Sequence, residues 1–195
     1  MLRIIAGSLR GRRLHTPGGL DTRPTADSMK ETLYNVLGNA VRGASVADLY
    51  AGSGNLGLEA LSRGAAHAVF VEKSPAALAV LRQNIAALGV GSQAQVVPGD
   101  ALRYLETTLA HRFDIVIADP PYALGVEDQL LESAAAKTSG QGWFVLQHGK
   151  QWAAPDSAPG WSRLRPRRFG VTVIDFFLRE ERGDGGSYGA VPGDI

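Results

Sequence analysis

The chain of 195 residues contains no cysteine, which excludes disulfide bonds, cysteine-ligated iron–sulfur clusters and a cysteine nucleophile. Its four histidines are scattered without the spacing of metal ligands, so we predict no metal site. No apolar run approaches the length of a transmembrane helix, and the first residues become polar too soon for a signal peptide. These absences favour a cytoplasmic protein without a membrane partner.

The composition predicts one main domain with a small appendage. Hydrophobic residues make up 45% of the chain and charged residues 20%, which is enough apolar material for one substantial core. We expect the main domain over residues 26–180, preceded by a basic hairpin and linker over residues 1–25. Residues 181–195 are rich in glycine and poor in apolar side chains, so we expect a disordered tail there.

The order of the apolar segments predicts a doubly wound α/β fold with a mainly parallel sheet. Between Val46 and His148, short β-branched runs alternate with helical patterns. One helix is predicted over residues 75–88, because apolar residues recur at positions 78, 81, 85 and 88 and Gly89 follows. Residues 142–147 are the expected fifth strand, and residues 161–165 and 171–178 are an expected antiparallel pair that closes the sheet.

The sequence Asp119-Pro120-Pro121-Tyr122 follows an apolar run, residues 113–118, that is typical of a buried parallel strand. The two prolines end that strand, because they cannot donate hydrogen bonds to a neighbouring strand. The Asp119 carboxylate and the Pro120 carbonyl could accept both N–H groups of an exocyclic purine amine, and Tyr122 could stack on the base. The alternative is a tight turn in which Asp119 only caps a loop.

A second motif lies where an apolar run from Val46 leads into Gly52-Ser53-Gly54. Gly57 completes the spacing G-x-G-x-x-G of dinucleotide-binding loops. Glycines let a backbone approach a ligand closely, and the helix that follows presents N–H groups. Glu72 ends the next apolar run, where an acidic side chain can bind both ribose hydroxyls. Sites for NAD and for S-adenosylmethionine share this arrangement.

Two more acidic residues favour S-adenosylmethionine over NAD. Asp48 lies in the strand before the glycine loop and can reach toward a ligand ammonium group, and Asp100 ends a third predicted strand, residues 95–100, near the expected adenine. Carboxylates at four successive strand ends suit a cationic sulfonium better than a pyrophosphate. The alternatives are a strand-end acceptor for Asp48, a helix N-terminal charge for Glu72, and for Asp100 the N-cap of a helix over residues 101–109. The candidate cofactor-binding residues are Asp48, Tyr50, Gly52, Ser53, Gly54, Glu72, Lys73, Asp100, Ala101 and Asp119.

Basic residues are unevenly placed, although the net charge of the chain is only +1. One group lies in the predicted hairpin around a Gly7-Ser8 turn and is a candidate for phosphate contacts with nucleic acid: Arg3, Arg10, Arg12 and Arg13. A second group consists of Arg163, Arg165, Arg167 and Arg168. For both groups the alternative is a solvated strand edge that resists aggregation.

Between the hairpin and the core, Arg23-Pro24-Thr25 leads into a predicted helix. Its apolar face consists of Met29, Leu33, Val36 and Leu37. A capping box from Ser28 to Glu31, or a start at Thr25 or Asp27, is expected to begin this helix. Because a helix at this point can pack beside the cofactor crevice, Arg23 and Thr25 are candidates for the RNA-binding site. A simple helix entry is the alternative.

Together these segments resemble the bacterial family that methylates N2 of a guanine in the 16S ribosomal RNA of the small subunit. The resemblance rests on residues 3–7 and 10–13, the segment 23–25, residues 48–63 and the tetrad 119–122, and it extends to about Glu181. The tetrad alone also occurs in adenine-N6 methyltransferases of DNA. The N-terminal segment, joined to the Arg-Pro-Thr sequence, indicates this family.

The resemblance implies S-adenosylmethionine as cofactor and 16S rRNA, within the small subunit or its assembly intermediate, as partner. It assigns the loop 52–54 to the amino-acid end of the cofactor, Glu72 to the ribose and Asp100 to the adenine. The catalytic residues would be Asp119, Pro120, Pro121 and Tyr122, with guanine N2 attacking the sulfonium methyl group in line, S-adenosylhomocysteine leaving, and no protein nucleophile. Nothing in the sequence requires more than a monomer. The rival hypotheses are an adenine-N6 DNA methyltransferase and a noncatalytic RNA-binding module that senses S-adenosylmethionine.

Overall fold

The computed structural model describes residues 2–16, 24–108, 112–155 and 158–180, with only the backbone for 24–26. Within these ranges, eight strands form one sheet in the order β3-β2-β1-β4-β5-β8-β6, and β7 pairs with β8. The strands are β1 (Ser45–Leu49), β2 (His67–Glu72), β3 (Ala94–Pro98), β4 (Phe113–Ala118), β5 (Thr138–Gly149), β6 (Trp161–Arg163), β7 (Arg167–Phe169) and β8 (Thr172–Arg179). The helices are α1 (Pro24–Leu37), α2 (Asn55–Ser62), α3 (Pro75–Leu88), α4 (Ala101–Thr107) and α5 (Glu127–Lys137), with short 3-10 turns η1 (Gly38–Val41), η2 (Gly91–Gln93) and η3 (Tyr122–Leu124).

The sheet is parallel over most of its width and antiparallel at one edge. Strands β3, β2, β1, β4 and β5 are parallel, and β8 pairs antiparallel with β5, β6 and β7. The predicted α/β class and the closing antiparallel strands are therefore confirmed. Because parallel strands present their carboxyl ends at one edge, the residues that follow β1, β2 and β4 lie along the same side of the sheet.

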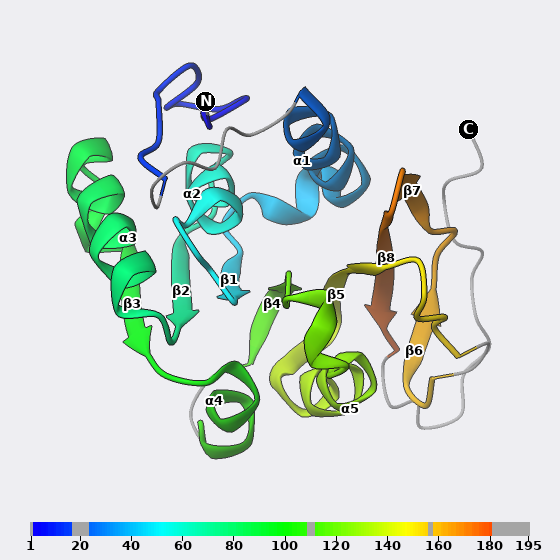
Figure 1. Ribbon diagram of the computed structural model, residues 1–195. Helices are drawn as coiled ribbons and strands as arrows, with labels where there is room; N and C mark the ends of the chain where they lie inside the picture. The colour runs from blue at the N-terminus through cyan, green and yellow to red at the C-terminus, as the bar shows by residue number, and fades with distance from the viewer. Residues whose placement is uncertain (1, 17–23, 109–111, 156–157, 181–195) are drawn as a thin grey trace.

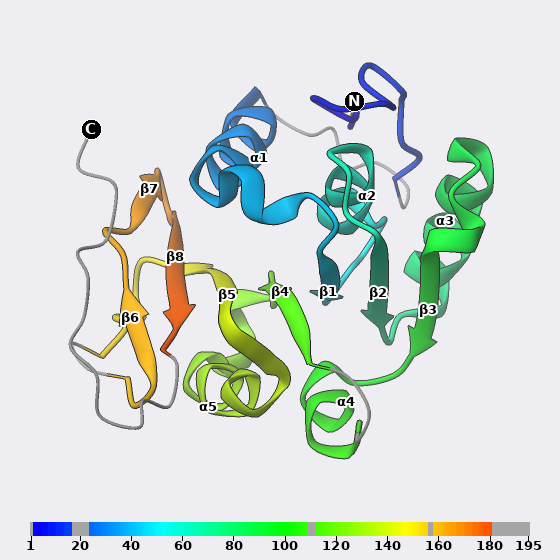
Figure 2. The ribbon, with the colours of Figure 1, turned by 180° about the vertical axis from the view of Figure 1, so that it is seen from behind.

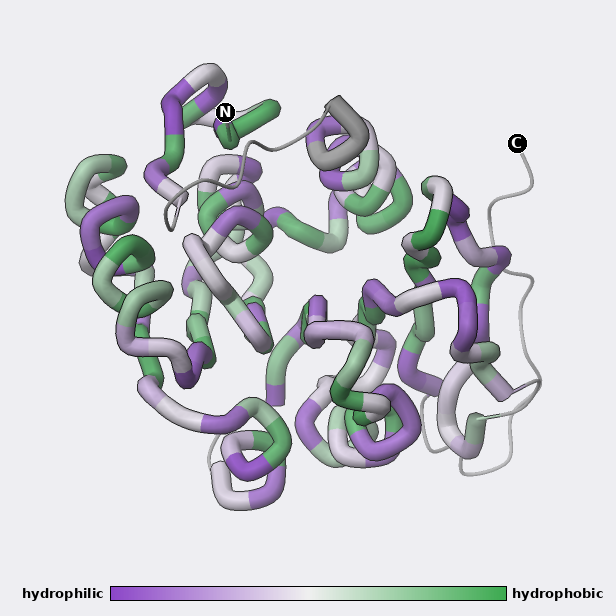
Figure 3. The backbone as a smooth tube through the Cα atoms, viewed as in Figure 1, coloured by the Kyte–Doolittle hydropathy of each residue, from purple (hydrophilic) through white to green (hydrophobic). Residues whose placement is uncertain are grey.

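Helices cover both faces of this sheet (Figures 1 and 2). Residues of α1, α2 and α3 belong to one hydrophobic cluster, and residues of α4 and α5 belong to a second. Successive residues of a strand alternate between the two clusters: Val46 of β1 lies in the first and Ala47 in the second. The apolar residues of the central strands are visible as green segments in Figure 3. The core therefore has two layers, one on each face of a buried sheet.

Helix α3 forms as its sequence predicts. Ser74 caps the N-terminus by accepting a hydrogen bond from Ala77 N at 3.4 Å, and Pro75 occupies the first turn. Gly89 ends the helix with φ 72°, a left-handed conformation that glycine adopts without steric cost. The apolar residues at positions 78, 81, 85 and 88 are all buried.

Several element boundaries differ from the prediction. Helix α1 begins at Pro24, so the capping box predicted at Ser28 is wrong, and Thr25 and Asp27 lie inside the first turn. Proline is favoured there because its missing N–H needs no partner in a first turn. Strand β5 is longer than residues 142–147, because it pairs with β4 on one side and β8 on the other. Helix α4 ends at Thr107 rather than at residue 109.

Residues 2–16, called the arm below, form the predicted hairpin. Arg3 and Arg13 form an antiparallel bridge, and Leu14 N donates a hydrogen bond to Leu2 O at 2.9 Å. The side chains of Leu2, Ile4 and Leu14 are buried in the cluster that contains α1, α2 and α3. Figure 1 shows the arm in dark blue beside α2. The arm is therefore packed onto the body of the protein.

The predicted linker residues 17–23 and the predicted tail 181–195 lie outside the described residues. The division of the chain into a hairpin, a main domain and a tail stays a prediction. Among the helices of the described ranges, none has the length and apolar character needed to cross a membrane.

Candidate active site

A pocket of about 360 Å³ opens at the carboxyl ends of β1 and β4. Its walls come from the arm, α1, the segment that joins β1 to α2, the residue after β4 and the end of β5. In doubly wound folds this edge of the sheet is where ligands bind. Most of its polar lining comes from Lys30, Asp48, Ser53, Asn55, Asp119 and Gln147.

The segment 50–55, called the glycine loop below, has a backbone that few sequences could adopt. Gly52 and Gly54 have φ 56° and 84°, and Tyr50 has φ 60°, which non-glycine residues rarely adopt. A Cβ atom on Gly54 would lie 2.5 Å from Leu81 Cδ1. Tyr50, Gly52 and Ser53 all line the pocket, as expected for cofactor-binding residues. Their contact with a cofactor stays a prediction.

Asp48 is buried in β1 and also lines the pocket. Its Oδ2 accepts a hydrogen bond from Gly57 N at 2.7 Å. The alternative role considered for Asp48, a hydrogen-bond acceptor at the strand end, is therefore part of what it does. A Cβ atom on Gly57 would lie 2.3 Å from the Phe70 ring and 3.0 Å from Asp48 Oδ2, which explains the glycine. Burial raises the pKa of Asp48 to about 8, because removal of water disfavours the charged form.

Glu72 ends β2 and holds the glycine loop. Its Oε2 accepts a hydrogen bond from Gly52 N at 2.8 Å, and its Oε1 accepts one from Ser74 N at 2.7 Å. A carboxylate has about four acceptor positions, so two of them are available for ribose hydroxyls. The predicted ribose contact stays a prediction, but Glu72 already orders the loop that forms the pocket wall.

Asp100 is the N-cap of α4, which was the alternative to a role at the adenine. Its Oδ1 accepts hydrogen bonds from Leu102 N at 3.1 Å and Arg103 N at 3.2 Å. Its Oδ2 lies 3.9 Å from Lys73 Nζ, an exposed ion pair that joins the ends of β2 and β3. Ala101 is the first residue of α4 and is buried. The roles predicted for these residues at the adenine are not tested by these contacts.

Asp119 follows β4 directly and lines the same pocket as Asp48. The residue as a whole is exposed, but its carboxylate loses hydration to the protein atoms around it. The resulting loss of hydration raises the pKa of Asp119 to about 6. A carboxyl group with such a pKa can accept a hydrogen bond at neutral pH and can also take up a proton during a reaction.

The rest of the tetrad lies outside the pocket wall. Pro120 is buried, Pro121 is exposed, and Tyr122 begins the short turn η3. The Tyr122 hydroxyl shares a hydrogen bond of 2.8 Å with Thr172 Oγ1 on β8, and burial raises its pKa. The structure thus brings Asp119 to the pocket and leaves stacking of Tyr122 on a base as a prediction.

The candidate RNA-binding arginines differ in their surroundings. Arg3 Nε is 3.1 Å from Asp27 Oδ2, and Arg12 Nη2 donates a hydrogen bond to the carbonyl oxygen of Ala87 at 2.6 Å. Arg10 and Arg13 are exposed, which suits contact with phosphates. Two other candidates lie outside the described side chains: all of Arg23 and the side chain of Thr25.

The second basic cluster is partly engaged within the protein. Arg163 Nε donates a hydrogen bond to Asp175 Oδ1 at 2.8 Å, and His148 Nε2 is 2.8 Å from Asp175 Oδ2. Asp175 and His148 are both buried, so Arg163 serves the packing of β5, β6 and β8. Arg165 and Arg168 are exposed.

Sequence reasoning missed four polar residues around the pocket. Lys30, Glu59 and Asn84 are almost completely buried, and burial lowers the pKa of Lys30 although Glu59 opposes this effect. Gln147 is also buried, lines the pocket and makes no side-chain hydrogen bond within the described part of the chain. The available signal was a polar residue inside an apolar helix or strand, such as Glu59 between Leu58 and Ala60.

The chemistry of the pocket fits S-adenosylmethionine. Asp48 is a buried carboxylate with no ion pair to any residue that the structure describes, and Asp119 is a second acidic group in the same pocket. A ligand that carries an ammonium and a sulfonium group would be attracted to these two acidic groups and would favour their ionised forms. The glycine loop lets the backbone approach such a ligand closely.

Proteins similar to this chain in sequence or structure are named methyltransferases. The chain is 35% identical over 190 residues to ribosomal RNA small subunit methyltransferase D of Escherichia coli (strain K12), covering 94% of this chain and 92% of that protein. The solved structure of Escherichia coli yhhF has a TM-score of 0.83 and 34% identity, covering 92% of this chain and 98% of that chain. The structure of SMU.776 complexed with SAH has a TM-score of 0.66 and 13% identity, covering 80% of this chain and 50% of that chain, and it shares the fold.

The fold, the glycine loop and the acidic pocket define a Rossmann-like methyltransferase. The chain also matches the model of the family described as Conserved hypothetical protein 95 over residues 2–178. Since that match covers most of the chain, the protein belongs to this family.

Proposed function

We propose that this protein methylates the exocyclic N2 of a guanine in the 16S rRNA of the small ribosomal subunit, or of its assembly intermediate. The observation that carries the proposal is Asp119, placed after β4 in the pocket that also contains Asp48 and the glycine loop. The Escherichia coli relative is named a ribosomal RNA small subunit methyltransferase, and it matches this chain over nearly all its length. The choice of N2 rests on the arm joined to the segment 23–25, because the 119–122 tetrad is shared with adenine-N6 methyltransferases.

Asp48, the glycine loop, Asp119 and Pro120 each have a task in this reaction. Asp48 and the glycine loop bind the amino-acid end of the cofactor, and S-adenosylmethionine supplies an electrophilic methyl group. The Asp119 carboxylate and the Pro120 carbonyl accept the two N–H groups of the amine, which turns its lone pair away from the ring. The proton lost from nitrogen goes to Asp119, whose raised pKa suits this transfer, or to water.

Orientation accounts for much of the rate in this scheme. Holding two bound reactants in line can lower a barrier by about 7–11 kcal/mol without a covalent intermediate. The target base must first leave its stack, which costs a few kcal/mol and least in a loop. A guanine in a loop or at a helix end, presented to a monomeric enzyme in the cytoplasm, is therefore the expected substrate.

Mass mapping of ribosomal RNA from cells that lack the protein tests this proposal. We expect one guanine of 16S rRNA to lose one methyl group, and purified protein to restore it on small-subunit particles. Asp119→Ala should abolish most transfer, whereas Tyr122→Phe should be mild because the ring is retained. Methylation of DNA adenine instead, or no product with saturating cofactor and immature particles, would contradict the proposal.

A further inference from the structure

Two buried polar side chains each contact both the arm and the glycine loop. One is Asn84 on α3, and the other is Lys30 on α1. The arm carries the exposed arginines expected to contact RNA, and the glycine loop is expected to contact the cofactor. These two side chains therefore connect the two expected binding regions directly.

Asn84 joins the end of the arm to the middle of the loop. Its Oδ1 accepts a hydrogen bond from His15 N at 2.8 Å, and its Nδ2 donates to His15 O at 3.0 Å and to Ser53 O at 2.9 Å. Both amide hydrogens are thereby used. Because Asn84 is only 1% exposed, water does not replace these bonds easily, and a shift of His15 is transmitted to Ser53.

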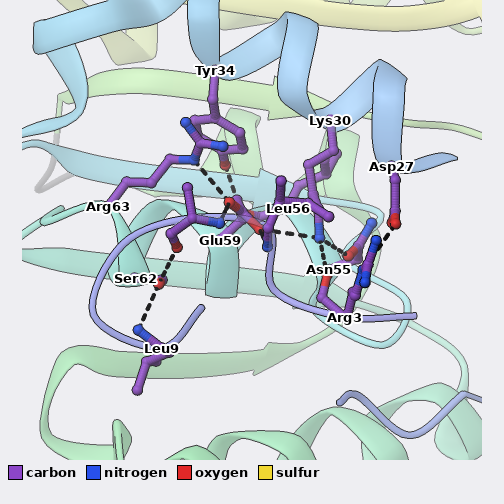
Figure 4. Close-up of polar contacts among 12 residues, drawn as sticks. Arg3, Leu9, Asp27, Lys30, Tyr34, Asn55, Leu56, Glu59, Ser62 and Arg63 are labelled. Atoms are coloured by element: carbon purple, nitrogen blue, oxygen red, sulfur yellow. Dashed lines mark hydrogen bonds and ion pairs between the residues drawn. The ribbon is translucent and has the colours of Figure 1, made fainter. Parts of the chain in front are cut away.

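Lys30 makes the second connection, shown in Figure 4. Its Nζ donates hydrogen bonds to Arg3 O at 2.5 Å and to Asn55 Oδ1 at 2.7 Å, and it lies 3.1 Å from Glu59 Oε2. These three partners match the three hydrogens of an ammonium group. Asn55 is the last residue of the glycine loop and the first of α2, so Lys30 links the arm to the far end of the loop.

The arm is held firmly enough for these links to transmit a change. Glu59 accepts hydrogen bonds from Ile5 N at 2.8 Å and Ala6 N at 2.9 Å, and Ser62 Oγ accepts one from Leu9 N at 3.0 Å. A Cβ atom on Gly7 would lie 1.8 Å from the Ser62 carbonyl oxygen, so the arm approaches α2 as closely as a glycine permits.

The arm and the loop also line one pocket. Leu2 and Thr16, near the two ends of the arm, line it together with Ser53 and Asn55. The loop itself needs support from its neighbours, since Tyr50 has φ 60° and such a conformation persists only where surrounding contacts stabilise it. Contacts from Asn84 and Lys30 provide part of that support.

We propose that Asn84 and Lys30 are positioning residues that couple the docking of ribosomal RNA on the arm to the binding of cofactor at the glycine loop. This inference rests on the proposed function. RNA bound to the arm holds the arm in one position, and the two side chains then hold Ser53 and Asn55. The cofactor binds a loop that is already ordered, so each ligand raises the affinity for the other.

The experiment measures the affinity of the protein for small-subunit particles, isolated from cells that lack it, with and without saturating S-adenosylhomocysteine. Coupling between sites is reciprocal, so it can be read from either ligand. For the wild-type protein we expect binding to particles to tighten by about fivefold or more when S-adenosylhomocysteine is present. In Asn84→Ala this ratio should fall toward one, because only the Lys30 link remains, whatever happens to each affinity alone.

Two further variants complete the design. Gln83→Ala changes the exposed neighbour of Asn84 on the same helix and should keep the wild-type ratio. Asn55→Ala removes the loop side of the Lys30 contact and lowers the ratio even if Asn84→Ala fails to fold; because Asn55 also lines the pocket, the ratio and not the cofactor affinity is compared. A wild-type ratio of one, or the wild-type ratio retained in Asn55→Ala and in any folded Asn84→Ala, overturns the inference. If the wild-type protein methylates particles but shows no coupling, only this inference is refuted. If it does not methylate particles, the proposed function is refuted.

Discussion

Cofactor binding should release a proton from Asp48. With its pKa raised to about 8 by burial, the carboxyl group is about 90% protonated at pH 7 in the free protein. A ligand ammonium group near Asp48 favours the charged form and lowers this pKa. If the bound value lies well below 6, binding releases about 0.9 protons per molecule at pH 7, and affinity rises with pH from 6 to 7 by almost tenfold.

Calorimetry of S-adenosylhomocysteine binding in two buffers of different ionisation enthalpy measures this proton count. The Asp48→Asn variant is the control, because it keeps an acceptor for the Gly57 N–H but cannot titrate. The difference between the two proteins isolates Asp48 from the titration of the ligand. An equal proton count in both proteins would refute the assignment of Asp48 to the cofactor's ammonium group.

The same group makes a prediction about stability. The folded-state pKa of Asp48 lies above its ordinary value of 3.8, so the native state binds more protons than the unfolded state between about pH 4 and pH 8. The Asp48 contribution to stability is therefore lost progressively as pH rises through that window. At pH 8 without ligand, Asp48→Asn should unfold at a higher temperature than the wild-type protein, and at pH 4 the difference should disappear.

Four further outcomes are expected. Methyl transfer should increase as pH rises through about 6, where Asp119 becomes ionised, and a pH–rate profile of Asp119→Asn should lack this step at its low residual rate. Glu72→Ala removes two charged hydrogen bonds worth about 1.5–3 kcal/mol each, so calorimetry should show much weaker S-adenosylhomocysteine binding; unchanged affinity would contradict the role of Glu72. Changing Arg10 and Arg13 together to alanine should reduce the salt slope of particle binding by about 1.4–1.8 and leave cofactor affinity unchanged; an unaltered slope would make them a solvated edge. Gln147 lines the pocket with Asp119, so Gln147→Leu should raise the KM for particles several-fold. Folding should change little, because no buried partner is left unpaired. An unchanged KM would show that Gln147 does not contact the substrate.

The parts of the site that could be predicted depend on local sequence. Asp48, the glycine loop and Asp119 each adjoin a strand whose apolar pattern is plain, and a parallel sheet places such residues at one edge. The hairpin was also predictable from local sequence, because an apolar run is followed by a Gly7-Ser8 turn.

The parts that could not be predicted depend on distant partners. Asn84 lies 69 residues from His15 and 31 from Ser53, so no local pattern reveals that it contacts both. Asp100 illustrates the opposite difficulty, because its local role as a helix cap is real and does not decide whether it also contacts adenine. Strand β7 is a different case, because its partner β8 begins only three residues after Phe169, but three residues are too few to show an apolar pattern.

The docking of the arm has a consequence for the order of folding. The arm is synthesised before the groups that hold it: Glu59 follows its partners Ile5 and Ala6 by 54 and 53 residues, and Asn84 follows His15 by 69. Contacts of such long separation form late and slow the folding of a chain. A nascent chain that has not yet produced α3 therefore leaves the apolar residues of the arm without their complete core, exposed to chaperones or to aggregation. The pocket, which includes Leu2 in its wall, is completed only when the first residues of the chain return to pack against a body synthesised after them.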